Sequence, residues 1–296
     1  MSFSADVKNE LLSIEQNACC QLASDYAFLL FARSFTSDEI SILSKNQSVT
    51  EGFCDAVKRL SGAEITCEKA GGKNFRAQLT DKAAISVIFD RLGLSGTAVK
   101  KRVNFANITD PCCYNAFLRG VFLACGTVTD PAKEYHLEFS VSSKGLCDDL
   151  LHIFDEFEPT PKVTPRGGAY TVYFKSSGDI EDALAIMGAM ENSLMYMSAK
   201  LEKDIRNKVN RKVNFESANL QRTVAAATRQ YEAIAKIKEK IGFDTLPPEL
   251  REIAQLRYND RESSNSEIAA MLSKPLTVSG VNHRFQKLIK IAGELK

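Results

Sequence analysis

The chain has 296 residues, a formal net charge of +1, 44% hydrophobic residues and 25% charged residues. These are ordinary values for a folded globular protein, and they exclude a largely disordered chain. The 16 glycines and 8 prolines also exclude a collagen-like polymer. No run of about 18 apolar residues occurs, and the polar start MSFSADVKNELLS lacks the order of a signal peptide. We therefore expect a cytoplasmic protein without a membrane span.

The charge is unevenly distributed along the chain. Residues 1–198 carry 19 Lys and Arg against 25 Asp and Glu, whereas residues 199–296 carry 19 against 12. An asymmetry of this kind suggests a nucleic-acid partner for the basic part.

The first two-thirds of the chain repeat one order of elements. The first copy is predicted to contain, in order, a helix at 25–35, a strand at 39–44, a helix at 52–60, strands at 63–67 and 74–79 around the turn Gly71-Gly72, and a helix at 81–91. The second copy is predicted to contain a helix at 115–125, a strand at 135–141, a helix at 146–154, strands at 162–164 and 170–174 around Gly167-Gly168, and a helix at 179–187. The shared order predicts a duplicated αββαββα unit and a two-lobed α+β domain, with lobes at residues 1–100 and 101–198.

The first helix of each copy carries a recognisable motif. Residues 118–126, LRGVFLACG, resemble the LAGLIDADG motif of homing endonucleases, and residues 26–34, YAFLLFARS, are a weaker match. Gly120 would let two helix backbones approach closely. In that family two such helices form the seam between two αββαββα lobes, and the strands of the lobes sit on DNA. The resemblance implies the same arrangement here.

The metal-binding acid of that motif is missing from both helices. Its position is occupied by Arg33 in the first and by Cys125, followed by Gly126, in the second. An arginine repels a cation, and a thiol is a poor ligand for magnesium, which prefers oxygen donors. We therefore predict an endonuclease-like scaffold with no catalytic residues, no metal and no cofactor.

A basic segment rich in asparagine and arginine follows the lobes. Residues 199–219 are interpreted as a connector, in which Lys208, Arg211 and Lys212 are predicted to contact the DNA backbone. The alternative is that this segment only orders the hinge between domains. A helix at about 217–241 is predicted to open the C-terminal domain.

The last 50 residues predict a helix-turn-helix. Helices are expected at 246–257, at 266–272 and from 278 to about 292, with Thr277 capping the third. The exposed face of the third helix is predicted to read bases and hold phosphates, and the residues assigned to it are Ser279, Asn282, His283, Arg284, Lys287 and Lys290. The turn before this helix is longer than usual. An ordinary three-helix domain with a solvated basic face is the alternative. The all-α domain is assigned to residues 220–296.

Eight cysteines are present, with two adjacent pairs and no C-x-x-C. This spacing does not match that of zinc sites, so we expect reduced cysteines that serve as small core residues.

Over nearly its full length the chain resembles the WhiA family of bacterial regulators. The resemblance rests on Ser2-Phe-Ser4, Val7-Lys8, Glu10-Leu11, Cys19-Cys20, Phe117–Phe122 with Gly126, Tyr135–Glu138, Asn210-Arg211, Asn214, Ala218-Asn219 and Ser279–Arg284. Members combine degenerate LAGLIDADG lobes with a helix-turn-helix and regulate cell division and, in spore-formers, sporulation. The resemblance implies a nucleoid-associated, sequence-specific regulator of transcription.

Double-stranded DNA is the expected partner, and neither a membrane nor a small-molecule substrate is expected. Two alternatives remain at this point. One is a metal-dependent endonuclease with relocated acids such as Asp38 or Asp130. The other is an adaptor that binds other transcription regulators or RNA polymerase.

Overall fold

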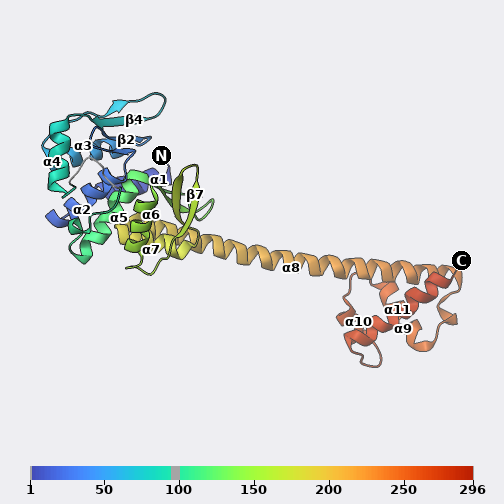
Figure 1. The fold of residues 1–296 in the computed structure, drawn as a ribbon. Coiled ribbons are helices and arrows are strands. Elements are labelled where there is room, and N and C mark those ends of the chain that lie inside the picture. Colours follow the sequence, from blue (N-terminus) through green and yellow to red (C-terminus); the bar gives the residue numbers. More distant parts are fainter. Residues whose placement is uncertain (1, 95–100, 296) are drawn as a thin grey trace. The chain divides into compact units, whose positions relative to one another are not determined.

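The computed structural model describes residues 2–94 and 101–295, and the chain folds into two compact units, Met1–Asp204 and Ile205–Lys296 (Figure 1). Each unit has a hydrophobic core of its own. The predicted lobe boundary between residues 100 and 101 adjoins residues 95–100, which lie outside the described residues. No helix among the described residues is long and apolar enough to cross a membrane.

The first unit contains the duplicated element order. Helix α1 (Phe3–Leu12) precedes the first lobe, which consists of α2 (Ala18–Leu30), β1 (Ser34–Phe35), β2 (Ile40–Ser44), α3 (Gln47–Ser61), β3 (Glu68–Lys69), β4 (Phe75–Leu79) and α4 (Lys82–Arg91). The second lobe consists of α5 (Pro111–Cys125), β5 (Gly126–Val128), β6 (Leu137–Val141), α6 (Lys144–Phe154), β7 (Lys162–Arg166), β8 (Ala169–Phe174) and α7 (Ser177–Met187).

Each lobe builds one antiparallel four-stranded sheet. The strand orders are β1-β2-β4-β3 and β5-β6-β8-β7, so the two lobes share one topology. Gly167 and Gly168, with φ of 59° and 83°, form the β7–β8 hairpin turn, which needs two left-handed residues. The predicted αββαββα duplication is confirmed.

Some element boundaries differ from those predicted. Residues 63–67 alternate between half-buried and exposed, but they are not a strand, because pairing with β4 begins only at Glu68 opposite Arg76. Helix α2 begins seven residues before the predicted start, since the side chain of Asn17 caps it by accepting a hydrogen bond from the backbone N–H of Cys20. The short strands β1 and β5 belong to the repeat but were not located from the sequence.

The two motif helices, α2 and α5, pack against each other as a seam between the lobes. A Cβ added at Gly120 would lie 2.2 Å from the carbonyl oxygen of Ser24 and 2.8 Å from the Cβ of Ala27. The missing side chain therefore lets the two backbones meet. Aromatic side chains close the seam, with the ring of Phe117 lying 5.9 Å from those of Tyr26 and Phe31.

One long helix, α8 (Met190–Lys240), begins in the first unit and ends in the second. The carboxylate of Glu10 accepts hydrogen bonds from the backbone N–H groups of Glu191 and Asn192, which satisfies two donors of its first turn. The expectation that a helix starts only near residue 217 was wrong, because residues 199–219 are helical throughout.

The second unit packs three further helices on the end of α8. These are α9 (Pro248–Asn259), α10 (Asn265–Met271) and α11 (Val278–Glu294). Ile234 and Ile237 of α8 are fully buried in the core of this unit. This part of α8 therefore contributes to the core of the second unit, which begins at Ile205.

We predict that Gly120→Ala destabilises the first unit by about 1–3 kcal/mol, because the added carbon forces two packed backbones apart. Helix propensity alone favours alanine by about 1 kcal/mol, so any loss of stability reports the packing. Thermal and urea denaturation measure it. The matched control is Gly178→Ala in α7, where the new carbon meets only Ser176 Oγ, at 3.8 Å. Equal stability of the two variants would contradict the close packing of α2 and α5 at Gly120.

Candidate DNA interface

The start of α11 is fixed by local hydrogen bonds. The side chain of Thr277 accepts from the backbone N–H of Gly280 at 3.2 Å, as the sequence predicts for a capping residue. Six residues, 272–277, separate α10 from α11, which bears out the expectation of a long turn. Glu252 holds this turn by accepting from the backbone N–H and the hydroxyl of Ser273.

Two reciprocal hydrogen bonds cap the start of helix α10. Ser264 Oγ accepts from the backbone N–H of Glu267, and the Glu267 carboxylate accepts from the backbone N–H of Ser264. This reciprocal capping box stabilises a helix of only seven residues.

One face of α11 is apolar and buried, and the opposite face is polar and exposed. Val281, Phe285, Leu288 and Ala292 lie in the core of the unit. The exposed side chains recur at helical spacing on the other face: Ser279, Asn282, His283, Gln286, Lys287 and Lys290. Five of the six predicted interface residues of this helix therefore share one solvent-facing surface, which we call the α11 face.

Arg284 is the exception among the predicted interface residues. Its side chain is only 18% exposed, and its guanidinium donates to the Glu249 carboxylate of α9 at 3.1 Å. A base contact by Arg284 would require this ion pair to open first. Arg284 is therefore less accessible than Asn282 and His283, which are exposed.

A buried arginine that the sequence did not single out holds the helix-turn-helix together. Arg257 of α9 is 1% exposed and donates to the side chains of Gln230 in α8 and Asn265 in α10. It also donates to the carbonyl of Ser263, and its guanidinium lies over the Phe285 ring at 5.3 Å. One side chain thus links α8, α9, α10 and α11.

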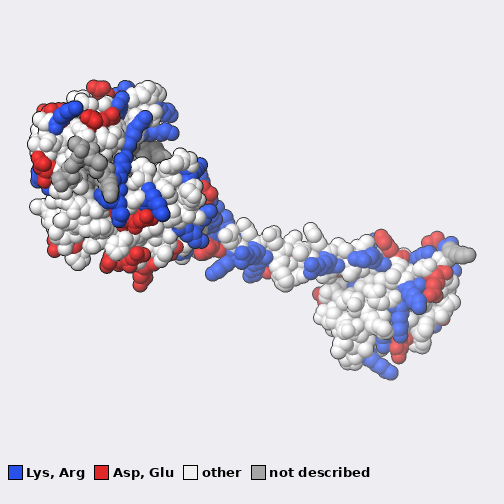
Figure 2. Space-filling model, in the orientation of Figure 1, with Lys and Arg blue, Asp and Glu red and all other residues white. Residues whose placement is uncertain are grey.

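The predicted connector cations lie on the exposed surface of α8. Arg211 and Lys212 follow Lys208 by three and four residues, so the three side chains share one helix face. Figure 2 shows Lys and Arg grouped along this helix with few acidic side chains between them. The face suits a polyanion such as the DNA backbone.

The degenerate motif positions lie at the C-terminal ends of the seam helices. Cys125 ends α5, and burial raises the pKa of its thiol to about 12. Lys8 of α1 donates from Nζ to the carbonyl oxygen of Leu123 at 3.1 Å, and burial lowers the pKa of this ammonium to about 8. Gly126 begins β5. A thiol beside an amine offers none of the carboxylate oxygens that magnesium prefers.

Arg33 and Cys125 line one hollow of about 200 Å³ at these helix ends. None of the described residues around it is acidic, and those that line it are Phe31, Ala32, Arg33, Ile42, Leu43, Ala124, Cys125, Ser140, Ser142 and Ala169. The two relocated acids of the endonuclease alternative lie elsewhere. Asp38 pairs with Lys82 at 3.3 Å, and Asp130 accepts from the backbone N–H of Ala132 in a turn.

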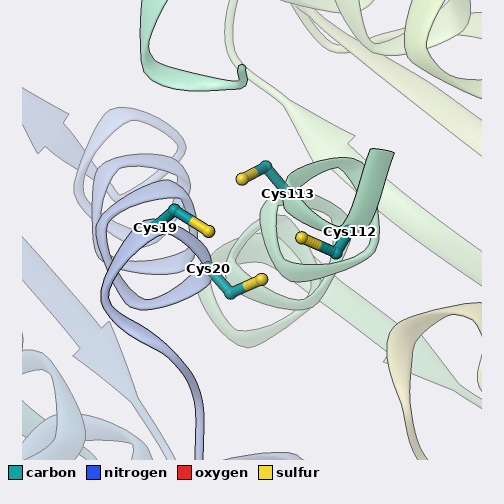
Figure 3. Close-up of side chains that lie close together, drawn as sticks. All are labelled: Cys19, Cys20, Cys112 and Cys113. Carbon is teal, nitrogen blue, oxygen red and sulfur yellow. The ribbon is translucent and has the colours of Figure 1, made fainter. Parts of the chain in front are cut away.

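Four of the cysteines converge, although they are far apart in the sequence. The sulfur atoms of Cys19, Cys20, Cys112 and Cys113 all lie within 4.8 Å of one another (Figure 3). Their spacing along the chain did not indicate this cluster, because cysteines from two different helices can meet without being close in sequence. Burial raises the pKa of the Cys20 thiol to about 12, and the hydrogen bond with Cys112 adds to this shift.

Two family models match most of the C-terminal two-thirds of the chain. The model of the WhiA LAGLIDADG-like domain matches residues 114–206, and the model of the WhiA C-terminal HTH domain matches residues 209–292. The first covers the second lobe and the start of α8, and the second covers the α11 face.

Full-length relatives show the same similarity. A protein of Caldicellulosiruptor bescii named "Probable cell division protein WhiA" is 36% identical, over 100% of this chain and 96% of its own length. A protein of the same name from Alkaliphilus oremlandii is 35% identical, over 100% and 98%. The solved structure described as "full-length DUF199/WhiA from Thermatoga maritima" is 26% identical, with a TM-score of 0.60, and the match covers 100% of this chain and 99% of that one.

Proposed function

Because the chain belongs to the WhiA family, we propose that it is a sequence-specific DNA-binding protein that regulates transcription in cell division and chromosome organisation. In a spore-forming host the same activity would extend to sporulation. The proposal places the protein in the cytoplasm, on the nucleoid, with double-stranded DNA as its partner.

The observation that carries the proposal is the α11 face. A capped helix of 17 residues presents polar and basic side chains to solvent and is held rigidly from behind by a core of large apolar residues. Such a helix fits the major groove, where side chains near its start reach base edges. The amide of Asn282 offers the donor and acceptor that match adenine. Lys287 and Lys290 lie further along the same face, where phosphates would run.

The lobes are proposed to act without catalysis. The two places where the endonuclease motif needs acids hold Arg33 and Cys125, and Lys8 adds an amine beside Cys125. Their retained fold serves, in this proposal, as a scaffold for regulation rather than as a nuclease.

The base-reading role is tested with duplexes selected from a random-sequence pool by the full chain. Asn282→Ala and His283→Ala should each weaken binding to the selected duplex by roughly 5- to 150-fold, corresponding to about 1–3 kcal/mol, and relax preference at one base. Fluorescence anisotropy measures the affinity. Glu294→Ala, exposed at the far end of α11, is the control and should bind as the parent does. An unchanged ratio of selected to unselected binding in both variants would contradict the role.

The connector role is tested by the salt dependence of binding to a duplex of mixed sequence. Neutralising Lys208, Arg211 and Lys212 to Gln should reduce the slope of log K against log salt by about 1 for each lost phosphate contact. A triple variant at Lys58, Lys82 and Lys133 of the lobes removes the same charge and should leave the slope unchanged. Equal slopes in the parent and the connector variant would remove these residues from the DNA footprint.

The absence of catalysis is tested with supercoiled plasmid in the presence of Mg²⁺ or Mn²⁺. We expect no nicked or linear product at protein concentrations that saturate the DNA, because the described lining of the hollow offers no acid to a metal. Metal-dependent nicking that disappears in Asp38→Asn or Asp130→Asn would instead establish the endonuclease alternative.

A further inference from the structure

Each of the two repeats supplies two of the four cysteines that cluster at the seam. Cys19 and Cys20 lie in the first turn of α2, and Cys112 and Cys113 lie in the first turn of α5 (Figure 3). Each pair occupies the second and third positions of its helix. The cluster therefore sits at the N-terminal end of the seam, whereas Arg33 and Cys125 lie at the opposite end.

The arrangement of the sulfur atoms is close to what a tetrahedral metal site requires. In a site with four thiolates at about 2.3 Å from zinc, the sulfur atoms are about 3.8 Å apart. No two of the sulfur atoms here are more than 4.8 Å apart, so small rotations of the side chains bring all four into place. A core that used these cysteines only as small apolar residues would not need four sulfur atoms in mutual proximity.

The surroundings of the cluster suit a negatively charged centre. Four thiolates around a divalent cation carry a net charge of −2, and the N-terminal ends of two helices stabilise negative charge. Arg119, buried on α5, is near enough to Cys20 for their charges to interact.

We propose that Cys19, Cys20, Cys112 and Cys113 bind one zinc ion, which links the first turns of α2 and α5. Binding releases up to four thiol protons to the solvent, because each sulfur coordinates as a thiolate. Four protein ligands leave no open position, so the site is structural and not catalytic. Cys112 is exposed and provides the route by which the ion enters.

A disulfide explains the cluster less well. A disulfide joins two sulfur atoms at about 2.05 Å, so two separate disulfides would be needed to use all four cysteines. All eight cysteines are free in this structure. Four converging donors of one type, soft and held by two rigid helices, are typical of zinc binding in a reducing compartment.

The test uses the full chain, reduced and stripped with a chelator under anaerobic conditions. Titration with Co²⁺ should produce the thiolate charge-transfer band and the visible bands of a tetrahedral four-sulfur site, saturating at one equivalent per chain. Zn²⁺ should then displace the cobalt, with a Kd of about 10 nM or tighter in competition with a chromogenic chelator.

Matched cysteine variants assign the site. Cys112→Ser should weaken zinc binding more than about 100-fold, beyond what loss of a supporting residue around a metal ligand causes. Cys54→Ser, a partly buried cysteine of α3 outside the cluster, should bind as the parent does. If Cys112→Ser does not fold, the cobalt spectrum and stoichiometry of the parent decide the question alone.

Two results would overturn the proposal. One is a parent chain that binds no cobalt or zinc while all eight thiols react as free groups after unfolding. The other is a disulfide between a cysteine of α2 and a cysteine of α5 in protein isolated from cells, which would make the cluster a redox pair.

Discussion

The close approach of α2 and α5 is the constraint on which the architecture of the first unit depends. It exists because Gly120 has no side chain at the point where the backbone of Ser24 crosses. With the helices in contact, each lobe can place its four-stranded sheet beside the seam, and the two sets of apolar side chains merge into one core. The seam also determines what lies at its ends: a cluster of thiols where both helices begin, and Arg33 and Cys125 where they finish.

The same packing can persist while the chemistry around it changes. Fold stability at the seam requires small and apolar side chains, whereas metal-dependent cleavage requires carboxylates at the helix ends. The first requirement is met here, and the described residues that line the hollow with Arg33 and Cys125 include no carboxylate. Lys8 illustrates the difference, because its buried amine lies beside Cys125, where the endonuclease motif has a metal-binding acid. In the second unit, rigidity instead comes from Arg257, whose hydrogen bonds hold the helices that support the α11 face.

Much of this architecture could be predicted from the sequence, since repeated alternation and paired glycines identify the two αββαββα units. The apolar spacing of Val281, Phe285 and Leu288 likewise identifies α11 and the face opposite its core. An apolar repeat of Leu201, Ile205, Val209 and Val213 could have indicated the helical connector, although all four side chains are exposed. Residues 199–219 were missed because their many charged and asparagine side chains were interpreted as a connector. They continue a helix that is anchored by buried residues in each unit, such as Tyr196 and Ile234.

Side-chain partners across elements were beyond the reach of sequence patterns. The pairing of Arg284 with Glu249 and the burial of Arg257 depend on how helices meet, not on spacing within one helix. The cysteine cluster shows the same limit, because two adjacent pairs 93 residues apart become neighbours only once the seam forms.

The central claim is that the chain binds duplex DNA through the α11 face. Hydrogen–deuterium exchange of the full chain, with and without a duplex selected from random sequence, measures this most directly. The account predicts slower exchange in residues 278–290 and in the α8 segment around residues 208–212. Slower exchange confined to the sheets of the lobes, with α11 unaffected, would contradict it.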